Sequence, residues 1–518
     1  MNSVAELTDA PANAGWGGGS WLTRLLILLT AAALIFSALI RLTAAGSQPL
    51  WLDEAWTLAV ASLPSWGEVF RHTWLDANAP LYYSLMHLWG GVFGFSNAAL
   101  RAPSILFGWL IPLPVLAAAI PGMSLRTRLV WAILLALWVQ GLWFSGDARG
   151  YALLALLCTG QTVAFVRMLD RPTVRSAGLW AALSAAAILT HYHALILGAL
   201  QGLAYLAMRR GQAVRTWPAA LIFLIPFGWL AVHAPRLVLF ARPDIAWYNL
   251  VRWNQAGPIL AFLVGTVRVA EHIAIAFGAG LLLSWLLPMK AHARRLGPAR
   301  FSLEVRALAA AALIAGLGAL SVLGLGIVRP SFTMRYLTPF APGVLLGVAL
   351  LFAWIGRRAP CALIALVGVI AVQAFIWWRH ELTVTGRVYN YEVASTLLMR
   401  GNPERLVFLW DHPAHRIEPD EQLAVVGDAF FRRAKRPVET VAVHVGANED
   451  PNPKLALAAK GKRSAILWMY DRGVQGTAAR RYPPDVEAFD PAMKCRNLGR
   501  GGIGILACDR YGSVLETR

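Results

Sequence analysis

Long apolar segments recur along most of this chain, and they restrict its fold more than any other feature of the sequence. About eleven of them approach the roughly 17 to 25 residues that an α-helix needs to cross about 30 Å of hydrocarbon. They lie near residues 22–42, 103–121, 129–145, 151–168, 177–190, 193–208, 217–234, 271–288, 305–328, 337–355 and 361–378. With 57% of its residues hydrophobic and only 14% charged, the chain cannot be a single water-soluble domain. We therefore expect an α-helical polytopic membrane protein with about 11 transmembrane helices.

The positive charge of the chain follows the apolar segments. Its 47 Lys and Arg against 28 Asp and Glu give a net charge of +19, which in a soluble protein would suggest nucleic acid. Here the cations gather in alternate connections, as in membrane proteins whose cytoplasmic loops are rich in Lys and Arg. The clusters are Arg126 and Arg128; Arg167, Arg171 and Arg175; Arg209, Arg210 and Arg215; Lys290, Arg294, Arg295, Arg300 and Arg306; and Arg357 and Arg358. This pattern predicts a cytoplasmic N-terminus and no nucleic-acid partner.

The expected organisation has three parts. Residues 1–21 form a cytoplasmic tail, residues 22–378 a transmembrane domain with a long exterior loop at 43–100, and residues 379–518 a soluble domain outside the membrane. Within the exterior loop, Leu81–Phe95 is apolar but too short to span, so we expect interfacial helices there.

The C-terminal part reads as a small α/β domain, because short apolar runs alternate with turn residues and helical patterns. The strand-like runs are Leu406–Trp410, Val438–Val443 and Ala465–Tyr470, and the helical patterns are Glu421–Ala434 and Pro453–Ala459. Cys495 and Cys508 flank a glycine-rich turn between two further strand-like runs. A disulfide between them fits an oxidising exterior.

The first exterior loop carries the most informative polar residues. Asp53 and Glu54 stand next to each other just past the first span, where charges are costly unless they have a task or a partner. Asp76, Asn78 and Tyr82 follow in the same loop.

Other polar residues return to this side of the membrane from distant parts of the sequence. They are Arg149 and Tyr151 between the third and fourth spans, His191 and His193 between the fifth and sixth, and Arg335 and Tyr336 between the ninth and tenth. Carboxylates, arginines and aromatic rings at one membrane surface suit a reaction on an anionic lipid with a sugar headgroup. An Asp would serve as base and an Arg would bind the phosphate.

The acids and the Asn also have interpretations without a substrate. Asp53 and Glu54 are typical of a solvated loop start or of a helix N-cap pair. Asp76 and Asn78 are typical turn formers before Pro80.

The cations and histidines have such interpretations as well. Arg149 and Arg335 are typical of interfacial side chains that extend toward water. His191 and His193, at i and i+2, could supply half of a metal site, but a polar turn near substrate explains them without one. We expect no metal and no cofactor.

Five segments, in their order along the chain, resemble the GT-C superfamily of membrane glycosyltransferases. The resemblance is to the family that includes protein O-mannosyltransferases and the bacterial transferases that add aminoarabinose to lipid A. The segments are Leu52-Asp53-Glu54-Ala55-Trp56; Asn78-Ala79-Pro80-Leu81-Tyr82-Tyr83; Phe93-Gly94-Phe95-Ser96 with Leu100-Arg101-Ala102-Pro103-Ser104; Ala148-Arg149-Gly150-Tyr151; and Arg335-Tyr336-Leu337-Thr338-Pro339. It covers about residues 20 to 380.

The resemblance implies an inverting transferase that moves a hexosyl or pentosyl group from a polyprenyl-phosphate donor to a lipid, glycan or protein acceptor. It implies Asp53 as the catalytic base and Glu54 as a neighbour that orients acceptor or base. Many relatives have His-Pro-Pro or Lys-Pro-Pro where this chain has Asn78-Ala79-Pro80, so the lipid phosphate would fall to Arg149, Arg335 or the two histidines. The polar residues at the outer face and the expected disulfide predict a bacterial inner membrane, in contact with membrane lipids and with the site facing the periplasm, although an endoplasmic reticulum membrane would look similar.

Two other functions fit a polytopic chain of this kind. A lipid or sugar transporter would also have many spans, but its charges would lie nearer the middle of the bilayer. A scaffold protein could use the C-terminal domain as a docking module.

Overall fold

The apolar stretches of the sequence all form helices. The computed structural model describes residues 21–44, 48–242, 250–286, 303–383, 391–411, 417, 419–445, 449–460, 462, 464–471, 491–492, 494–497 and 503–509. Most of the predicted cytoplasmic tail, residues 1–21, lies outside these ranges. Within them, eight helices are long and apolar enough to cross a membrane. They are α1 (Trp21–Ala44), α5 with α6 (Asn97–Leu110, Leu113–Ala117), α9 (Tyr151–Asp170), η1 with α13 (Trp217–Phe223, Leu224–Phe240), α15 (Val267–Leu286), α16 (Leu303–Val328), η4 with α17 (Met334–Phe340, Ala341–Ile355) and α18 (Pro360–Thr383).

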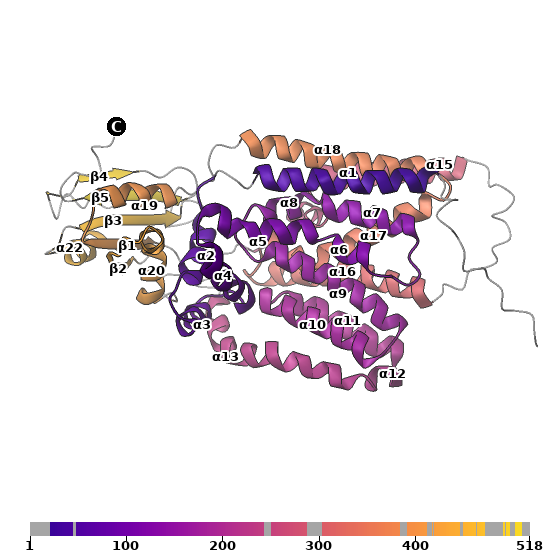
Figure 1. The fold of residues 1–518 in the computed structure, drawn as a ribbon, viewed down its shortest axis with the longest axis horizontal. Helices are drawn as coiled ribbons and strands as arrows, with labels where there is room; N and C mark the ends of the chain where they lie inside the picture. Colours follow the sequence, from indigo (N-terminus) through magenta and orange to yellow (C-terminus); the bar gives the residue numbers. More distant parts are fainter. Residues whose placement is uncertain are drawn as a thin grey trace, which may run out of the picture.

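The remaining three stretches are shorter or bent. The stretch at 129–145 forms α7 (Leu125–Ala136) and α8 (Val139–Ser145), which meet at an angle of 48°. The other two form the apolar helices α10 (Val174–Thr190) and α11 (Ala194–Arg209). Figure 1 shows these helices side by side in one bundle. The predicted fold class, an α-helical membrane protein, is confirmed.

The predicted exterior loop forms three short helices at one end of the bundle, α2 (Leu52–Ala61), α3 (Trp66–Leu75) and α4 (Pro80–Phe93). Local sequence explains their starts: the Ser65 hydroxyl accepts from the Glu68 amide at the start of α3, and Pro80 opens α4. α4 has 14 residues and is shorter than a span, in keeping with the interfacial helix expected there. These helices lie between the bundle and the C-terminal domain (Figure 1).

The C-terminal domain is built on one five-stranded sheet with the strand order β2-β1-β3-β5-β4. The strands are β1 (Arg405–Asp411), β2 (Glu439–His444), β3 (Ser464–Asp471), β4 (Lys494–Asn497) and β5 (Ile503–Asp509). The three predicted strands are the parallel part, β2-β1-β3. The helices are α19 (Tyr391–Arg400), α20 (Asp420–Gly427), α21 (Ala429–Arg433) and α22 (Asn452–Ala459).

The two cysteines of the expected disulfide lie on neighbouring antiparallel strands. Cys495 of β4 and Cys508 of β5 are directly opposite each other in the register. Their side chains lie outside the described part of the chain, so the disulfide stays a prediction.

The C-terminal domain is packed against α2 and the start of α5. Trp56 of α2 meets Trp410 of β1 edge to face, with ring centroids 6.5 Å apart, inside a shared hydrophobic cluster. Glu392 of α19 accepts from the Leu50 amide at 2.7 Å and from the Asn97 side chain at 2.9 Å, and it pairs with Arg433. This carboxylate therefore joins the C-terminal domain to the residues just before α2 and at the start of α5.

We expect Glu392→Gln to loosen this contact by about 2 kcal/mol, because the neutral amide cannot pair with the half-buried Arg433. The matched control is Glu421→Gln, which removes a pair with Arg71 whose side chains are 41% and 64% exposed, so its expected cost is below about 1 kcal/mol. Thermal unfolding and protease cleavage of the C-terminal domain measure the difference. Equal effects of the two substitutions would contradict the assigned role of Glu392.

Candidate active site

An ion pair between distant segments stands at the centre of the polar residues. Asp53 lies in the first turn of α2, and Arg335 lies in η4, 282 positions later. The Arg335 Nη1 donates to Asp53 Oδ2 at 2.8 Å, and the two side chains are 19% and 26% exposed. The Arg335 guanidinium also lies 5.7 Å from the Trp51 ring and 5.6 Å from the Tyr151 ring, within cation–π range.

The ion pair fixes the charge state of Asp53. Burial alone would raise the pKa of this carboxyl, but the positive charges of Arg149 and Arg335 and the hydrogen bond from Arg335 lower it below its usual value. Asp53 is therefore ionised at neutral pH and remains reachable from solvent.

Arg149, in the turn between α8 and α9, is the second cation of the site. Its Nη1 donates to the Asp53 carbonyl at 3.3 Å, and its Nη2 donates to Asn78 Oδ1 at 3.3 Å. Asp76 accepts from Asn78 and from the Tyr83 hydroxyl, both at 2.7 Å. Burial and the charge of Asp76 raise the pKa of Tyr83, so its hydroxyl stays protonated and donates. This network holds Arg149 beside Asp53.

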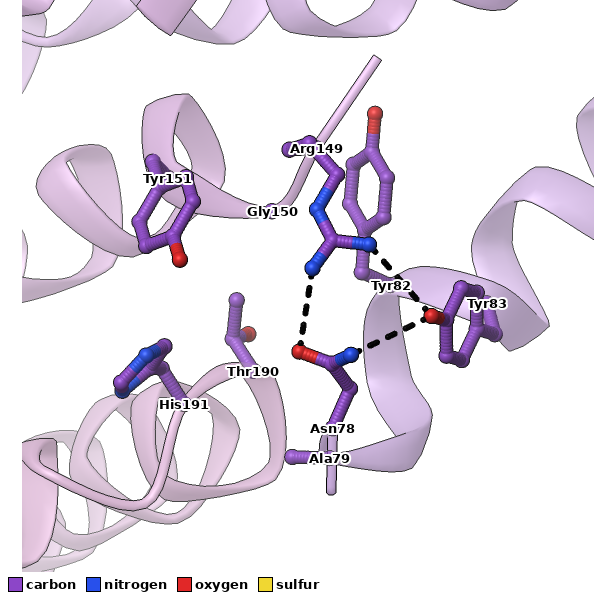
Figure 2. A pocket seen from close by; sticks show the side chains of 9 residues that line it. All are labelled: Asn78, Ala79, Tyr82, Tyr83, Arg149, Gly150, Tyr151, Thr190 and His191. Atoms are coloured by element: carbon purple, nitrogen blue, oxygen red, sulfur yellow. Dashed lines mark hydrogen bonds between the residues drawn. The ribbon is translucent and has the colours of Figure 1, made fainter. Parts of the chain in front are cut away.

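A pocket with an empty volume of about 320 Å³ opens next to Arg149. It is lined by Asn78, Ala79, Tyr82, Tyr83, Arg149, Gly150, Tyr151, Thr190 and His191. Figure 2 shows Arg149, Asn78 and Tyr83 hydrogen-bonded on one side, with Tyr151 and His191 facing them. Tyr82 contributes its ring, since its hydroxyl lies 3.0 Å from Ser104 Oγ. One wall is therefore cationic and the other aromatic.

The two predicted histidines lie against aromatic rings of the site. His193 stacks on Tyr336 with ring centroids 4.1 Å apart, and His191 lies 5.1 Å from the same ring and 5.7 Å from that of Tyr151. Burial lowers the pKa of His193 to about 4. Burial, with the nearby His193, Arg149 and Arg335, lowers the pKa of His191 well below its usual value. Both rings are therefore neutral near pH 7. Among the described residues, no three His, Cys, Asp or Glu side chains form a cluster that could hold a metal ion.

Glu54, the other half of the acidic pair, is placed quite differently from Asp53. It is fully buried, and its two carboxylate oxygens accept from Arg101 Nε at 2.7 Å and Arg101 Nη2 at 2.6 Å. Oε1 also accepts from the Ala148 amide at 2.9 Å, one residue before Arg149. Glu54 thus ties α2 to α5 and to the turn that carries Arg149. These contacts indicate that Glu54 positions Asp53 and Arg149. Its contact with substrate stays a prediction.

The structure brings all the predicted substrate and catalytic residues to one end of the bundle. It adds four residues to which the sequence analysis assigned no role: Trp51, Tyr83, Arg101 and Thr190. The sequence does indicate that Arg101 has a partner, because an arginine at the edge of an apolar stretch is costly when it is unpaired.

A fifth addition is His233, inside the apolar stretch 217–234. It contacts the Trp74 and Asp76 carbonyl oxygens at 3.0 and 2.9 Å through Nε2, and the Tyr192 hydroxyl at 2.6 Å through Nδ1. It therefore supports the segment that carries Asp76. The sequence could have pointed to His233, because an ionisable residue inside an apolar span usually has a structural or functional partner.

The two acids are expected to differ in their effect on stability. Glu54→Gln leaves the buried Arg101 without its counter-charge and should cost about 3 to 5 kcal/mol. Asp53→Asn removes a partly exposed pair and should cost about 1 kcal/mol or less. Thermal unfolding of the two purified variants in the same lipid environment tests the difference. A Glu54→Gln protein as stable as the Asp53→Asn protein would contradict the structural role of Glu54.

We expect the protein to lose stability in acid, because partial burial lowers the pKa values of His191 and His193. The pKa of His193 is about 4 in the folded chain and about 6.5 when unfolded. The unfolded state therefore binds more protons between these values, and stability falls as pH falls through this window. His193→Asn should unfold with a shallower dependence on pH between 7 and 5. A slope identical to that of the unchanged protein would show that His193 does not contribute.

Among known proteins, solved structures resemble this chain in fold, whereas sequence comparisons find no relative. No protein-family profile matches the chain, and no curated protein sequence matches it. Among solved structures, ArnT from Cupriavidus metallidurans in the apo state has a TM-score of 0.57 at 14% identity, over 96% of this chain and 99% of that chain. The same protein bound to undecaprenyl phosphate gives 0.56 at 15% identity, over 96% and 100%.

A more distant similarity is to the oligosaccharyltransferase of Archaeoglobus fulgidus in complex with zinc and sulfate. It has a TM-score of 0.50 at 14% identity, over 84% of this chain and 67% of that chain. Both proteins are membrane glycosyltransferases of the GT-C superfamily, as the sequence resemblance led us to expect. This chain has the fold of the GT-C membrane glycosyltransferases.

Proposed function

We propose that this protein is an inverting glycosyltransferase of a bacterial inner membrane, with its site facing the periplasm. It moves a hexosyl or pentosyl group from a polyprenyl-phosphate donor to a lipid, glycan or protein acceptor. The observation that carries the proposal is the ionised Asp53 held 2.8 Å from Arg335 and beside Arg149, next to a pocket with an aromatic wall. The ArnT structure bound to undecaprenyl phosphate supports the lipid class of the donor.

The proposed reaction is one displacement at the anomeric carbon. The acceptor oxygen forms a bond to this carbon as the bond from the carbon to the donor phosphate oxygen breaks. Asp53 takes the proton from the acceptor hydroxyl. The electron pair of the broken bond leaves with the lipid phosphate, whose charge is met by Arg149 and Arg335. Attack from the face opposite the phosphate inverts the anomeric configuration, and phosphate needs no general acid to leave near neutral pH.

The ion pair also suggests how Asp53 becomes a better base. While Arg335 is bound to it, the pKa of Asp53 is lowered and its proton affinity is weak. A donor phosphate competes for the same guanidinium, because arginine binds phosphate and carboxylate through the same donor fork. Movement of Arg335 to the phosphate removes part of the charge that lowers the pKa of Asp53. Donor binding would thereby raise the basicity of Asp53 before the acceptor reacts.

The aromatic wall suits the sugar. Tyr151 and His191 face the cationic wall across the pocket (Figure 2), and Tyr336 packs against both histidines. Neutral imidazoles and phenol rings offer flat surfaces for the C–H face of a pyranose, and the nitrogens can bond its hydroxyl groups. Because the rings are uncharged near pH 7, they do not compete with the arginines for the phosphate.

One observation favours a second candidate, a lipid or sugar transporter. The α7–α8 pair is bent by 48°. The buried Arg41 of α1 donates to the Ala136 carbonyl at the end of α7, at 3.2 Å. Broken helices with charges at membrane depth are typical of transporters. The charged residues of the proposed site, Asp53, Arg149 and Arg335, nevertheless lie together at one end of the bundle, which favours chemistry at the membrane surface.

The decisive variants are Asp53→Asn and Arg335→Gln. We expect Asp53→Asn to lower transfer by about 100- to 10,000-fold, the usual contribution of a general base. It should leave donor affinity equal or higher, because Arg335 is released for the phosphate. Arg335→Gln should weaken donor binding. Proteoliposomes supplied with a panel of radiolabelled polyprenyl-phosphate sugars measure both quantities.

The control is Glu439→Gln on the C-terminal domain, an exposed acid that pairs with Arg405 and Lys462, and this variant should transfer normally. An Asp53→Asn protein that folds, binds donor and transfers at a near-normal rate would refute the base assignment. Labelled sugar lipid that crosses the bilayer unchanged would favour the transporter. Mass spectrometry of cell-envelope lipids and glycans with and without the protein would identify the sugar and its acceptor.

A further inference from the structure

A second pocket lies where the C-terminal domain meets the loop between α4 and α5. Its empty volume is about 1080 Å³, and it shares no residue with the pocket beside Asp53. It is lined by Ser62, Gly94, Phe95, Ser96, Asn97, Arg432, Arg433 and Lys435. Three of these eight residues are cations and none is an acid. A pocket with this lining attracts anions.

The two arginines are held in fixed positions at the wall of this pocket. Arg432 donates from Nη2 to the Ala59 carbonyl at 2.9 Å and pairs with Asp428. Arg433 donates to Asn97 Oδ1 at 2.7 Å and pairs with Glu392. Each guanidinium has five N–H groups, so these contacts orient it without using all its donors. Such preorganisation lowers the entropic cost of binding a ligand.

The charge of Arg432 is not fully compensated by the protein. Burial lowers the pKa of its guanidinium to about 10. Its Nε is buried and has no hydrogen-bond partner among the described residues. A neighbouring anion would therefore stabilise this cation in its folded position.

Lys435 supplies a cation that no acid in the described part of the chain neutralises. It is exposed, and its backbone has a φ of 57°, the left-handed conformation in which a helix ending such as that of α21 usually has Gly or Asn. A lysine at this position is costly for the backbone, which points to a use for its side chain.

The start of α5 adds to the positive potential. This 14-residue helix begins at Asn97, and the Ser96 hydroxyl accepts only from the Ala99 amide among the first amides. Ser96 and Asn97 both line the pocket. The remaining amides of the first turn carry the positive end of the helix dipole toward it.

From these observations we infer that the pocket of Arg432, Arg433 and Lys435 is a second binding site, for a phosphate group carried by a lipid headgroup or by a soluble or glycan-linked phosphate. Ser62 follows the last residue of α2, whereas Asp53 lies in its first turn. At 1.5 Å per residue the two ends of α2 are about 15 Å apart. The phosphate held here is therefore not the leaving group at Asp53, and the inference does not depend on the proposed reaction.

The test measures inorganic phosphate binding by ³¹P NMR at constant ionic strength, with the full-length protein in phosphatidylcholine nanodiscs. All variants carry Arg335→Gln, which weakens phosphate binding at the active site, and all of them keep Arg149, so a difference between the two lysine variants arises at another site. The test variant is Lys435→Asn, because asparagine tolerates the left-handed backbone and should keep the fold. The matched control is Lys460→Asn, which removes an exposed lysine on the C-terminal domain that does not line the pocket.

We expect saturable phosphate binding that Lys435→Asn weakens about tenfold, the usual loss for one charge-assisted hydrogen bond, and that Lys460→Asn leaves unchanged. Adding phosphatidylglycerol to the nanodiscs separates the two sources. Loss of phosphate binding there identifies a lipid headgroup as the occupant, and unchanged binding identifies a soluble or glycan-linked phosphate. No saturable binding in phosphatidylcholine nanodiscs, or equal affinities for the two lysine variants, would overturn the site.

Discussion

The cost of placing carboxylates beside an apolar bundle is the constraint on which this structure depends. Asp53 and Glu54 are neighbours in sequence, yet they meet that cost in different ways. Glu54 is fully buried and accepts from Nε and Nη2 of Arg101, so its charge holds these segments together. Asp53 is half-buried and faces the charge of Arg335, so its charge remains available for chemistry. The buried pair of Glu54 and Arg101 thus positions the more exposed pair of Asp53 and Arg335.

The C-terminal domain has a place in the same arrangement. It packs on α2 through the contact between Trp56 and Trp410, and through Glu392 it holds the segment just before Asp53. Asp53 is therefore fixed from two sides, by the helical bundle through Arg101 and by the C-terminal domain through Glu392. A helix of ten residues would be marginal by itself. Tertiary contacts, rather than its own sequence, keep α2 in place.

Much of this could be predicted from the sequence where the signal is local. The length of the apolar segments located the helices, and short apolar runs between turn residues located β1, β2 and β3. The positive charge in alternate loops placed Arg149 and Arg335 on the same side as Asp53. The structure then brought them into contact. The resemblance implied Asp53 as base and Glu54 as its orienting neighbour, but the buried contacts of Glu54 could not be predicted, because they depend on Arg101, 47 positions later.

Two other features also depend on distant contacts. The stretch 129–145 looked like one span, but it bends between α7 and α8, where Arg41 from another helix reaches the free carbonyl of Ala136. The basic pocket at the C-terminal domain joins Asn97 to Arg433, which are 336 positions apart. Hydropathy and local motifs do not predict which distant residues pair. A cation inside an apolar segment does indicate that it has a partner elsewhere in the chain.

The central claim is that Arg335 serves the carboxylate of Asp53 and the phosphate of the donor in turn. A cryo-electron microscopy structure of the protein with undecaprenyl phosphate in nanodiscs tests it most directly. The account predicts phosphate density between Arg149 and Arg335, with the Arg335 guanidinium moved away from the carboxylate that it contacts at 2.8 Å without the lipid. Phosphate bound elsewhere, with that ion pair intact, would contradict it.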